Sequence, residues 1–535
     1  MSTARWLRVA VGVGSAGALG VGVLLGACAR ERTCVDVATC EPEGVGDAVV
    51  AARVGVADGR QVVVQGEQTS IPVTLERQGA SGDVVLSFAG APDTVTIAPV
   101  VVPKDETAAT VLVDVALAHP QGSLDGVTVT ARLATGDTTL SEAPLPLFVR
   151  GRSGAIDTTF GGGSVVGTLY SPFTHAIRLD DGAVIAVGAG HDEPVSITRF
   201  GADGTLDSAF ADAGVAITSV RHTADSTLAV WPHAAIDDAG RIVVSSHGLA
   251  RFTAAGQPDG SWNGGGVTAP GIGGGEPGAN FVDVAAGPQG TVLALESCES
   301  PACTQPYLRL ARFTATGSLD TTYAAPIGAR ALLTGATLLP DGRNARRLAL
   351  AGDGTAVVTH AVTEGTSRGG RVALVPPFGA APASASFPDD RDITAVALTP
   401  GGGILVARNT GTPGAKTMQI QMLRSDLSPD PSFGVSAWVD GAAAVPSSVQ
   451  VVDGGKVLVA GVFYDRHHVS LQRFMPDGKA DTAYGSNGSI VVDFGTPEIS
   501  GAFIQPDASV LVVGHTKANA DSGARVASLI VRLWQ

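Results

Sequence analysis

The sequence predicts an all-β protein in which an immunoglobulin-like β-sandwich precedes a β-propeller of seven blades. Three observations lead to this fold class. A turn-and-strand pattern repeats from residue 154 to the C-terminus, seven short strand signals occupy residues 48–150, and the composition favours turns and a large core. The chain has 70 glycines, 44% hydrophobic residues and only 16% charged residues, which argues against disorder.

Residues 1–27 are expected to be a targeting segment that is not part of the fold. Arg5 and Arg8 precede an apolar stretch, which ends in Leu-Gly-Ala-Cys at residues 25–28. This end resembles the lipobox of bacterial lipoproteins, which implies lipid attachment at Cys28 and membrane anchoring. An ordinary signal peptide and an uncleaved anchor are the alternatives. Ala29 favours the outer membrane under the sorting rule of enteric bacteria.

The other four cysteines form two close pairs, as expected of an exported protein. Cys34 and Cys40 lie in a polar tether predicted for residues 28–47, and Cys298 and Cys303 flank a predicted hairpin tip in the propeller. Local disulfides are the expectation. The alternative is a metal site made of all four thiolates. Neither pair has C-x₂-C spacing, so no metal is expected.

Residues 48–150 are predicted to form a separate sandwich domain. Stretches rich in Val, Ile, Leu and Thr, most of them separated by Gly- or Pro-containing turns, occur at 62–64, 71–75, 84–88, 95–97, 109–115, 127–131 and 145–149. That number and spacing are typical of an immunoglobulin-like sandwich. The domain also resembles Ig-like modules of bacterial surface proteins, which implies a spacer or an adhesion role. We expect a spacer.

The propeller is predicted for residues 151–535 from a unit whose tail carries an aspartate and, three positions later, an aromatic residue. The clearest copies are Asp157 with Phe160, Asp207 with Phe210, Asp320 with Tyr323, Asp430 with Phe433, and Asp481 with Tyr484. A copy that matches the pattern less well ends at Trp262, and a further, degraded copy is expected around Phe387. Most copies lie about 50–60 residues apart, which is the length of a propeller blade.

A second pattern keeps phase with these tails. A tight turn followed by a Val- and Ile-rich strand occurs seven times, near residues 181, 240, 290, 354, 403, 455 and 507. Each unit is therefore expected to form about four short strands that must pack on neighbouring units in a ring. The propeller region opens with a tail, and the chain stops where the next tail is due. We expect the N-terminal segment to pair with the final blade and close the ring. Six or eight blades remain alternatives.

The combined pattern Asp-Gly-x-Leu-Asp-x-x-Phe-Gly, Asp-Gly-x-Val-x-Val-x-Gly and x-Arg-Phe resembles the delta-60 repeat family over residues 154–535. This resemblance implies a bacterial β-propeller. It implies no catalytic residue in this chain, because none is assigned in the family. The chain departs from the family pattern between about residues 325 and 392, where an insertion is expected.

Motifs for catalysis or metal binding are sparse. The sequence contains neither H-E-x-x-H nor G-x-S-x-G. His467 and His468 would point to opposite faces of a strand, Ser246-His247 has no evident carboxylate partner, and the acidic cluster at 389–392 lacks calcium-loop spacing. The tail aspartates and aromatics recur from blade to blade, so we interpret them as structural. No catalytic residue and no cofactor are predicted.

These patterns leave two hypotheses about function. A net charge of −15 argues against nucleic-acid binding. The first hypothesis is a lipid-anchored protein of the bacterial cell envelope whose propeller binds an unknown protein or polysaccharide without catalysis. The alternative is an exported hydrolase or lyase that acts on extracellular polymers. It would need His, Asp or Glu, Arg or Tyr side chains from several blades in one deep pocket.

Overall fold

The protein was analysed as a computed structural model. It describes residues 51–56, 59–78, 82–136, 138–162, 172–189, 193–221, 231–268, 279–298, 303–304, 307–323, 329–334, 347–364, 367–377, 382–387, 390–410, 417–437, 444–463, 468–493, 497–505, 509–516 and 527–534. Apart from three short 3-10 segments at Phe160–Gly162, Pro288–Gly290 and Asp453–Gly455, the regular elements in these ranges are all strands. Within them, no helix is long and apolar enough to cross a membrane. The predicted fold class, an all-β chain with a sandwich followed by a seven-bladed propeller, is confirmed.

The N-terminal sandwich consists of two four-stranded sheets, with strand orders β1-β3-β7-β5 and β10-β9-β4-β6, and a small sheet β2-β11-β8. Its strands are β1 (Ala51–Val56), β2 (Gln61–Val64), β3 (Gln68–Gln78), β4 (Val84–Ala89), β5 (Val95–Ile97), β6 (Val100–Val102), β7 (Ala108–Val115), β8 (Gly122–Leu124), β9 (Thr128–Leu133), β10 (Thr139–Pro144) and β11 (Leu147–Arg150). Buried and exposed residues alternate along β7, where Val111, Val113 and Val115 point into the core. The sequence pattern missed β1, β6, β8 and β10, which are short or carry a weak apolar signal.

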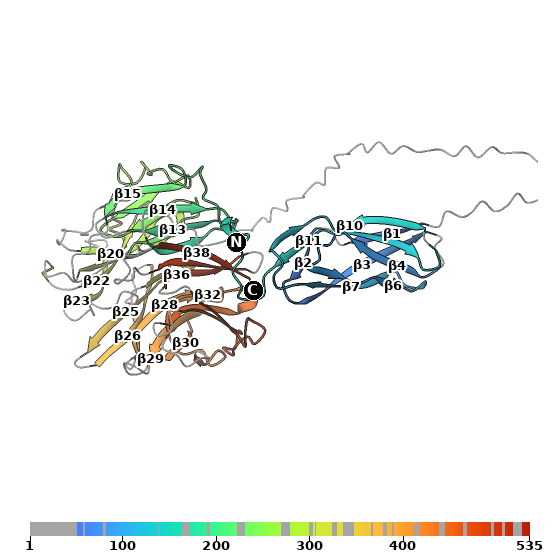
Figure 1. The fold of residues 1–535 in the computed structure, drawn as a ribbon. Coiled ribbons are helices and arrows are strands. Elements are labelled where there is room, and N and C mark those ends of the chain that lie inside the picture. The colour runs from blue at the N-terminus through green and yellow to red at the C-terminus, as the bar shows by residue number, and fades with distance from the viewer. Residues whose placement is uncertain are drawn as a thin grey trace, which may run out of the picture.

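Seven further sheets follow in chain order (Figure 1). The first three contain β12 (Phe173–Arg178), β13 (Val184–Gly188), β14 (Pro194–Phe200) and β15 (Val215–Arg221); β16 (His233–Ile236), β17 (Ile242–Ser245), β18 (Leu249–Phe252) and β19 (Val267–Thr268); and β20 (Ala279–Ala286), β21 (Val292–Cys298), β22 (Tyr307–Phe313) and β23 (Ala329–Thr334). Each is an antiparallel meander in sequence order.

The remaining four sheets repeat this arrangement. They contain β24 (Arg347–Leu350), β25 (Ala356–Glu364), β26 (Ser367–Val375) and β27 (Ala383–Phe387); β28 (Asp390–Leu398), β29 (Ile404–Thr410), β30 (Thr417–Leu423) and β31 (Val435–Ala437); β32 (Ala444–Val451), β33 (Val457–Phe463), β34 (His468–Phe474) and β35 (Ser489–Asp493); and β36 (Pro497–Ile504), β37 (Val510–Thr516) and β38 (Ala527–Leu533). The seven Val- and Ile-rich runs of the sequence are the second strands of the seven sheets.

Contacts between first strands show that the seven sheets form a closed ring. The first strand of each sheet contacts the first strand of the next, and β36 contacts β12. The first strands are therefore innermost, around the axis. The second strands β13, β17, β21 and β33 are buried along their whole length, because strands flank them on both sides and neighbouring sheets cover both faces. Such burial explains why they read as continuous apolar runs.

The seventh sheet is joined by residues from the start of the propeller. Ile156 pairs with Leu533 as an antiparallel bridge, and the amides of Gly154 and Asp157 donate to the carbonyls of Trp534 and Arg532 at 2.7 and 2.8 Å. In the first sheet the same bridge, Phe200 with Leu206, lies within one hairpin. The residues that follow in this N-terminal segment, 163–171, lie outside the described part of the chain.

The degraded copy of the repeat falls in the fourth sheet, but Phe387 is not its tail aromatic. Phe387 is the last residue of the outer strand β27, and the guanidinium of Arg408 lies 5.0 Å from its ring centroid. In the pairing of β27 with β26, Ala385 lies opposite Val372 and Phe387 opposite Gly370, so both residues belong to the outer strand itself and not to a tail before it. The sequence prediction placed the aromatic wrongly because the turn after β26 lacks the Asp-Gly marker. The turn ahead of β25 ends at Gly354, as the Gly354-to-Ala351 backbone bond of 2.9 Å shows.

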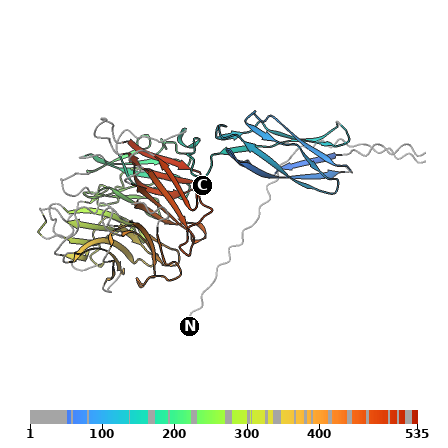
Figure 2. The same cartoon turned by 60° about the horizontal axis from the view of Figure 1, so that its bottom comes forward.

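The sandwich contacts the propeller at one end of the ring. Figures 1 and 2 both show the C-terminus at the junction of the two domains. Strand β38 runs antiparallel to β37, and therefore parallel to the inner strand β36. Because the end of β38 lies at the junction, the inner strands end toward the sandwich and begin at the opposite end of the ring.

Candidate functional site

The tail aspartates of the repeat stabilise turns. One carboxylate oxygen accepts the backbone N–H two residues further on, over distances of 2.8 to 3.3 Å. The residues that donate to Asp157, Asp207, Asp259, Asp320, Asp430 and Asp481 in this way are Thr159, Ala209, Ser261, Thr322, Ser432 and Ala483. The second oxygen pairs with the arginine of the preceding third strand. These ion pairs join Arg532 to Asp157, Arg199 to Asp207, Arg251 to Asp259, Arg312 to Asp320 and Arg473 to Asp481. Asp430 has no such arginine, because Met422 stands in its place.

The tail aromatics connect one sheet to the next. Phe160, which belongs to the seventh sheet's tail, packs on Gly204 in the turn of the first sheet, where an ideal Cβ would lie 2.6 Å from the ring. Phe210 packs in the same way on Gly256, and Trp262 on Gly317. The other side of the aromatic faces its own sheet's arginine, with distances to the ring centroid of 4.4 Å for Arg251 and Trp262, 4.5 Å for Arg473 and Tyr484, 4.8 Å for Arg312 and Tyr323, and 4.9 Å for Arg532 and Phe160. A backbone hydrogen bond beside the contact also joins the two sheets: the amide of Gly161 donates to the carbonyl of Asp203 at 2.8 Å. We call this unit of aspartate, arginine, aromatic and next-sheet glycine the joint.

A cluster of ionisable residues lies on the inner strands of four successive sheets, near the end of the ring that faces away from the sandwich. We call His175 (β12), His233 (β16), Asp283 (β20) and Arg347 (β24) the axial array. The rings of His175 and His233 have centroids 4.8 Å apart. Nδ1 of His233 lies 3.4 Å from a carboxylate oxygen of Asp283, and Nε2 lies 3.3 Å from a guanidinium nitrogen of Arg347. Arg347 therefore reaches past the third sheet to the second.

Backbone amides hold Asp283 in place. Its two carboxylate oxygens accept the N–H of Val284 at 2.8 Å and the N–H of Leu348 at 2.7 Å. The second bond links the third sheet to the fourth. Asp283 and His233 are buried, and His175 and Arg347 retain a small accessible surface. The array thus connects four sheets across the axis.

Burial sets the protonation states of the array. Desolvation, assisted by Arg347, lowers the pKa of His175 to about 4. Desolvation, with Arg347 and His175, lowers the pKa of His233 well below its ordinary value. Desolvation raises the pKa of Asp283 to about 6, against the opposing effects of Arg347 and the two amides. Both imidazoles are therefore uncharged at neutral pH, and Asp283 carries the charge that balances Arg347.

The sequence-predicted candidates do not join this array. His468 lies 4.0 Å from Asp493 on the neighbouring outer strand, and Ser246 is a buried residue whose carbonyl accepts the amide of Phe281. Cys298 and Cys303 form a disulfide in the third sheet, with a Cα–Cα distance of 5.9 Å. Cys28, Cys34, Cys40, His467 and Asp389 lie outside the described residues. In the part of the chain that the structure describes, no group of three His, Cys, Asp or Glu side chains is arranged to hold a metal ion.

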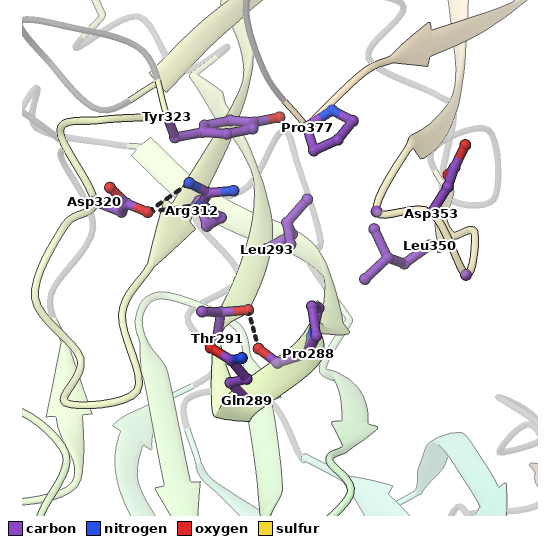
Figure 3. Close-up of a pocket in the computed structure, with 12 residues that line it drawn as sticks. Pro288, Gln289, Thr291, Leu293, Arg312, Asp320, Tyr323, Leu350, Asp353 and Pro377 are labelled. Carbon is purple, nitrogen blue, oxygen red and sulfur yellow. Dashed lines mark hydrogen bonds and ion pairs between the residues drawn. The ribbon is translucent and has the colours of Figure 1, made fainter. Parts of the chain in front are cut away.

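A pocket of about 360 Å³ lies between the third and fourth sheets, at the turns that join first to second strands (Figure 3). Leu293 and Tyr323 form its buried wall, and Gln289 and Asp353 stand on exposed turns at its rim. Arg312, paired with Asp320, lies beneath the Tyr323 ring. The pocket is thus walled by one joint and two turns, at the sandwich end of the ring and away from the array.

Sequence reasoning missed the axial array. Its four members lie on four different strands and share no motif or fixed position in the repeat. A signal was present, because polar residues interrupt the apolar pattern of the inner strands: His175 and His233 at or near strand starts, and Asp283 between Val282 and Val284. A search for ionisable residues at first-strand positions of each repeat would have found them.

No family model and no curated protein matches the chain. Among solved structures, it is similar to a polysaccharide lyase (10% identity, 68% of this chain and 90% of that chain, TM-score 0.41) and to a quinonprotein alcohol dehydrogenase-like protein from Bacteroides thetaiotaomicron (9% identity, 83% and 96%, TM-score 0.32). It is also similar to prolyl oligopeptidase B from Galerina marginata (9% identity, 66% and 45%, TM-score 0.34). Similarities this low identify no activity, and the fold rests on the sheet order and the ring of contacts.

Proposed function

We propose that this protein is a lipoprotein of the bacterial cell envelope, anchored through Cys28, whose propeller binds a protein or polysaccharide without catalysing a reaction. The leader and the cysteine at its end support the anchor. The ring of sheets with a recurring aspartate–arginine–aromatic joint supports kinship with delta-60 repeat proteins. Binding through a rigid ring and the mouth of its axis is the common use of such a scaffold.

One observation carries the non-catalytic proposal: the two charged groups of the axial array are bonded within the propeller. Both oxygens of Asp283 accept backbone amides, and Arg347 is bonded to His233. A general base or nucleophile needs a lone pair directed at the substrate. The groups of the array instead face one another and link four sheets. The array end also faces away from the sandwich, which follows the proposed anchor in the chain, so an anchored protein would present it outward.

Direct binding to defined polymers tests this proposal. The chain from residue 29 onward would be applied to arrays of bacterial polysaccharides and purified envelope proteins, as wild type, as Arg347→Lys and as Lys479→Ala. Arg347 belongs to the array, and Lys479 is an exposed lysine on a turn of the sixth sheet. We expect Arg347→Lys to weaken binding at least tenfold and Lys479→Ala to leave it unchanged. Absence of binding, or turnover of the polymer, contradicts the proposal, and equal binding by all three places the binding surface away from the array.

The anchor is tested separately in cells. The wild type is expected to incorporate labelled palmitate and to partition with membranes. Cys28→Ser should lose both properties, because the thiol is the acyl acceptor. Label that persists in Cys28→Ser would overturn the lipid anchor, whatever the propeller binds.

A specific observation favours a second function, an exported hydrolase or lyase acting on extracellular polymers. His175 and His233 are uncharged at neutral pH and lie beside a guanidinium. An uncharged imidazole accepts a proton, and an arginine stabilises developing negative charge. Incubation with polymers, followed by assays for new reducing ends and for ultraviolet-absorbing unsaturated sugars, tests this role. Activity lost in both His175→Ala and His233→Ala, with binding retained, would establish it. Absence of products from the polymers that bind would rule it out.

A further inference from the structure

The seam of the ring is the one place among the described sheets where the segment bridged to the third strand comes from a distant part of the chain. In the first, second, third, fifth and sixth sheets, the bridge after the third strand closes a short hairpin, as between Phe474 and Ala480. In the seventh sheet, the equivalent bridge joins Ile156 to Leu533. No covalent turn holds these two segments together. The seam is therefore where the ring opens most easily.

One side chain of the sandwich bonds to both segments of the seam. Gln121, immediately before β8, donates from Nε2 to the Ile156 carbonyl at 3.1 Å. Its Oε1 accepts the Thr158 amide at 2.9 Å and the Trp534 indole N–H at 2.9 Å. A single amide thus satisfies groups from the first and the last residues of the propeller. Its own conformation is supported by a further bond to the side chain of Gln65 at 3.4 Å.

Apolar and linker contacts surround Gln121. The ring of Phe148, on β11, lies edge-on to Trp534 with 6.0 Å between centroids, and Trp534 is only 6% exposed. The linker residue Arg152 turns back to the sandwich and donates to the carbonyls of Gln65 and Gly66 at 3.1 and 2.5 Å. At Gly151, an ideal Cβ would lie 2.7 Å from both Gln121 and Trp534, so only glycine fits between them.

We propose that the sandwich is a clasp that holds the propeller seam closed, with Gln121 as the residue that bridges the two chain ends. This role goes beyond the spacer expected from the sequence. It needs no assumption about a ligand, an enzyme activity or the lipid anchor. It requires the two domains to be rigidly joined, because a mobile sandwich could not keep three hydrogen bonds to the seam.

Hydrogen–deuterium exchange on the full chain tests the clasp. In Gln121→Leu, which keeps the bulk and removes all the bonds, we expect amides of 154–160 and 527–534 to exchange about tenfold faster, as the loss of hydrogen bonds of ordinary strength implies. The equivalent hairpin of the first sheet, 197–210, should be unchanged. Gln121→Glu keeps the acceptor for Thr158 and Trp534 but loses the donor to Ile156, so it should lie between the two.

Two controls keep the result interpretable. Gln68→Leu makes the same change at an exposed glutamine of the sandwich that bonds only to Asp114 in the neighbouring strand, and it should leave the seam unaffected. Protection of β3 and β7 reports whether the sandwich remains folded. A seam that exchanges at the wild-type rate in Gln121→Leu, while β3 and β7 stay protected, overturns the proposal. So does an equal effect of Gln68→Leu.

Discussion

Two joints of the ring fill the space between neighbouring sheets with side chains from opposite sides. Between the seventh and first sheets, the fully buried ring of Phe160 fills the space and Gly204 leaves room for it. Between the fourth and fifth sheets, the described residues include no tail aromatic, and Leu427 stands at the position of the turn glycine. Leu427 is 7% exposed and belongs to the same apolar cluster as Val372 and Ala385 of the fourth sheet. The side chain of Leu427 therefore packs into the interface between these two sheets from the fifth sheet, whereas Phe160 packs into its interface from the seventh.

The exchange has a backbone cost. Gly204 has φ +80°, which glycine adopts freely, and Leu427 has φ +67°. A leucine in this left-handed region costs about 1–2 kcal/mol. Burial of its side chain offsets that cost with a gain of about 1.5–3 kcal/mol. The difference shows that the space at a joint must be filled by an apolar side chain. Which of the two sheets provides that side chain matters less.

The largest effect is expected when leucine replaces the glycine of a joint that already has its aromatic residue. Gly204→Leu would collide with Phe160 and adopt a strained φ, which together should cost about 3–5 kcal/mol of unfolding free energy. The double variant Phe160→Ala/Gly204→Leu removes the aromatic ring that the leucine would meet, and it should recover at least half of the loss. Gly260→Leu, on an open surface, is the control. Urea titration measures all three, and a double variant no more stable than Gly204→Leu would refute the exchange of volumes.

A second variant replaces the arginine of a regular joint with methionine, the residue (Met422) that the fifth sheet has at this position. Arg251→Met leaves the largely buried Asp259 without its guanidinium partner. Loss of one member of a buried pair should cost about 3 kcal/mol. The additional Asp259→Ala change should give back part of this loss, because no uncompensated carboxylate remains. A double variant that is less stable than Arg251→Met, again by urea titration, would show that the carboxylate acts mainly through its turn.

A third pair of variants tests the leucine itself. Leu427→Ala should cost about 2–3 kcal/mol through the cavity it leaves. Leu427→Gly removes more side chain yet relieves the positive φ, so it should be the more stable of the two by about 1 kcal/mol. Thermal unfolding followed by circular dichroism gives the order. The reverse order would mean that backbone strain at Leu427 is negligible.

The smallest effect separates the joints from the axial array by pH. Asp259, Asp320 and Asp481 at the joints have lowered pKa values, through bonds to arginine and to serine, threonine or lysine that outweigh desolvation, so they stay ionised in mild acid. Between pH 6.5 and 4 the array titrates instead. Asp283, whose pKa is raised to about 6, binds its proton more tightly in the folded state, so its contribution to stability rises as pH falls. His175, whose pKa is lowered to about 4, binds its proton less tightly in the folded state, so its contribution falls.

These opposite trends make a matched experiment possible. The wild type should lose stability between pH 6.5 and 4, because the lowered pKa values of His175 and His233 both act against the single opposing contribution of Asp283. Asp283→Asn removes that opposing contribution and should lose on the order of 2 kcal/mol more than the wild type over the same range. The reciprocal variant His175→Asn should lose less stability than the wild type on acidification. Urea titrations at several pH values check both slopes, and parallel curves for the wild type and Asp283→Asn would contradict the assignment.

Much of the fold could be predicted because its signals are local. The Asp-Gly turns and the Val- and Ile-rich second strands follow from positive φ and from burial on both faces, which any copy shows by itself. Weak strands such as β1 and β10 could not be predicted, because their pairing with β3 and β9 determines them and their own composition does not. Phe387 shows the same limit: its aromatic side chain fitted the pattern, but its place at the end of β27 depends on register.

The sequence by itself determined the class of the fold, the seven repeats and the candidate lipid-attachment cysteine, because repetition and hydrophobic periodicity are properties of neighbouring residues. Only the tertiary structure decided which residues meet. Closure of the ring brings His175, His233, Asp283 and Arg347 together from four sheets, brings Gln121 to the seam, and packs Leu427 against the fourth sheet. Such contacts depend on the packing of whole sheets around an axis, and no local pattern of residues specifies them.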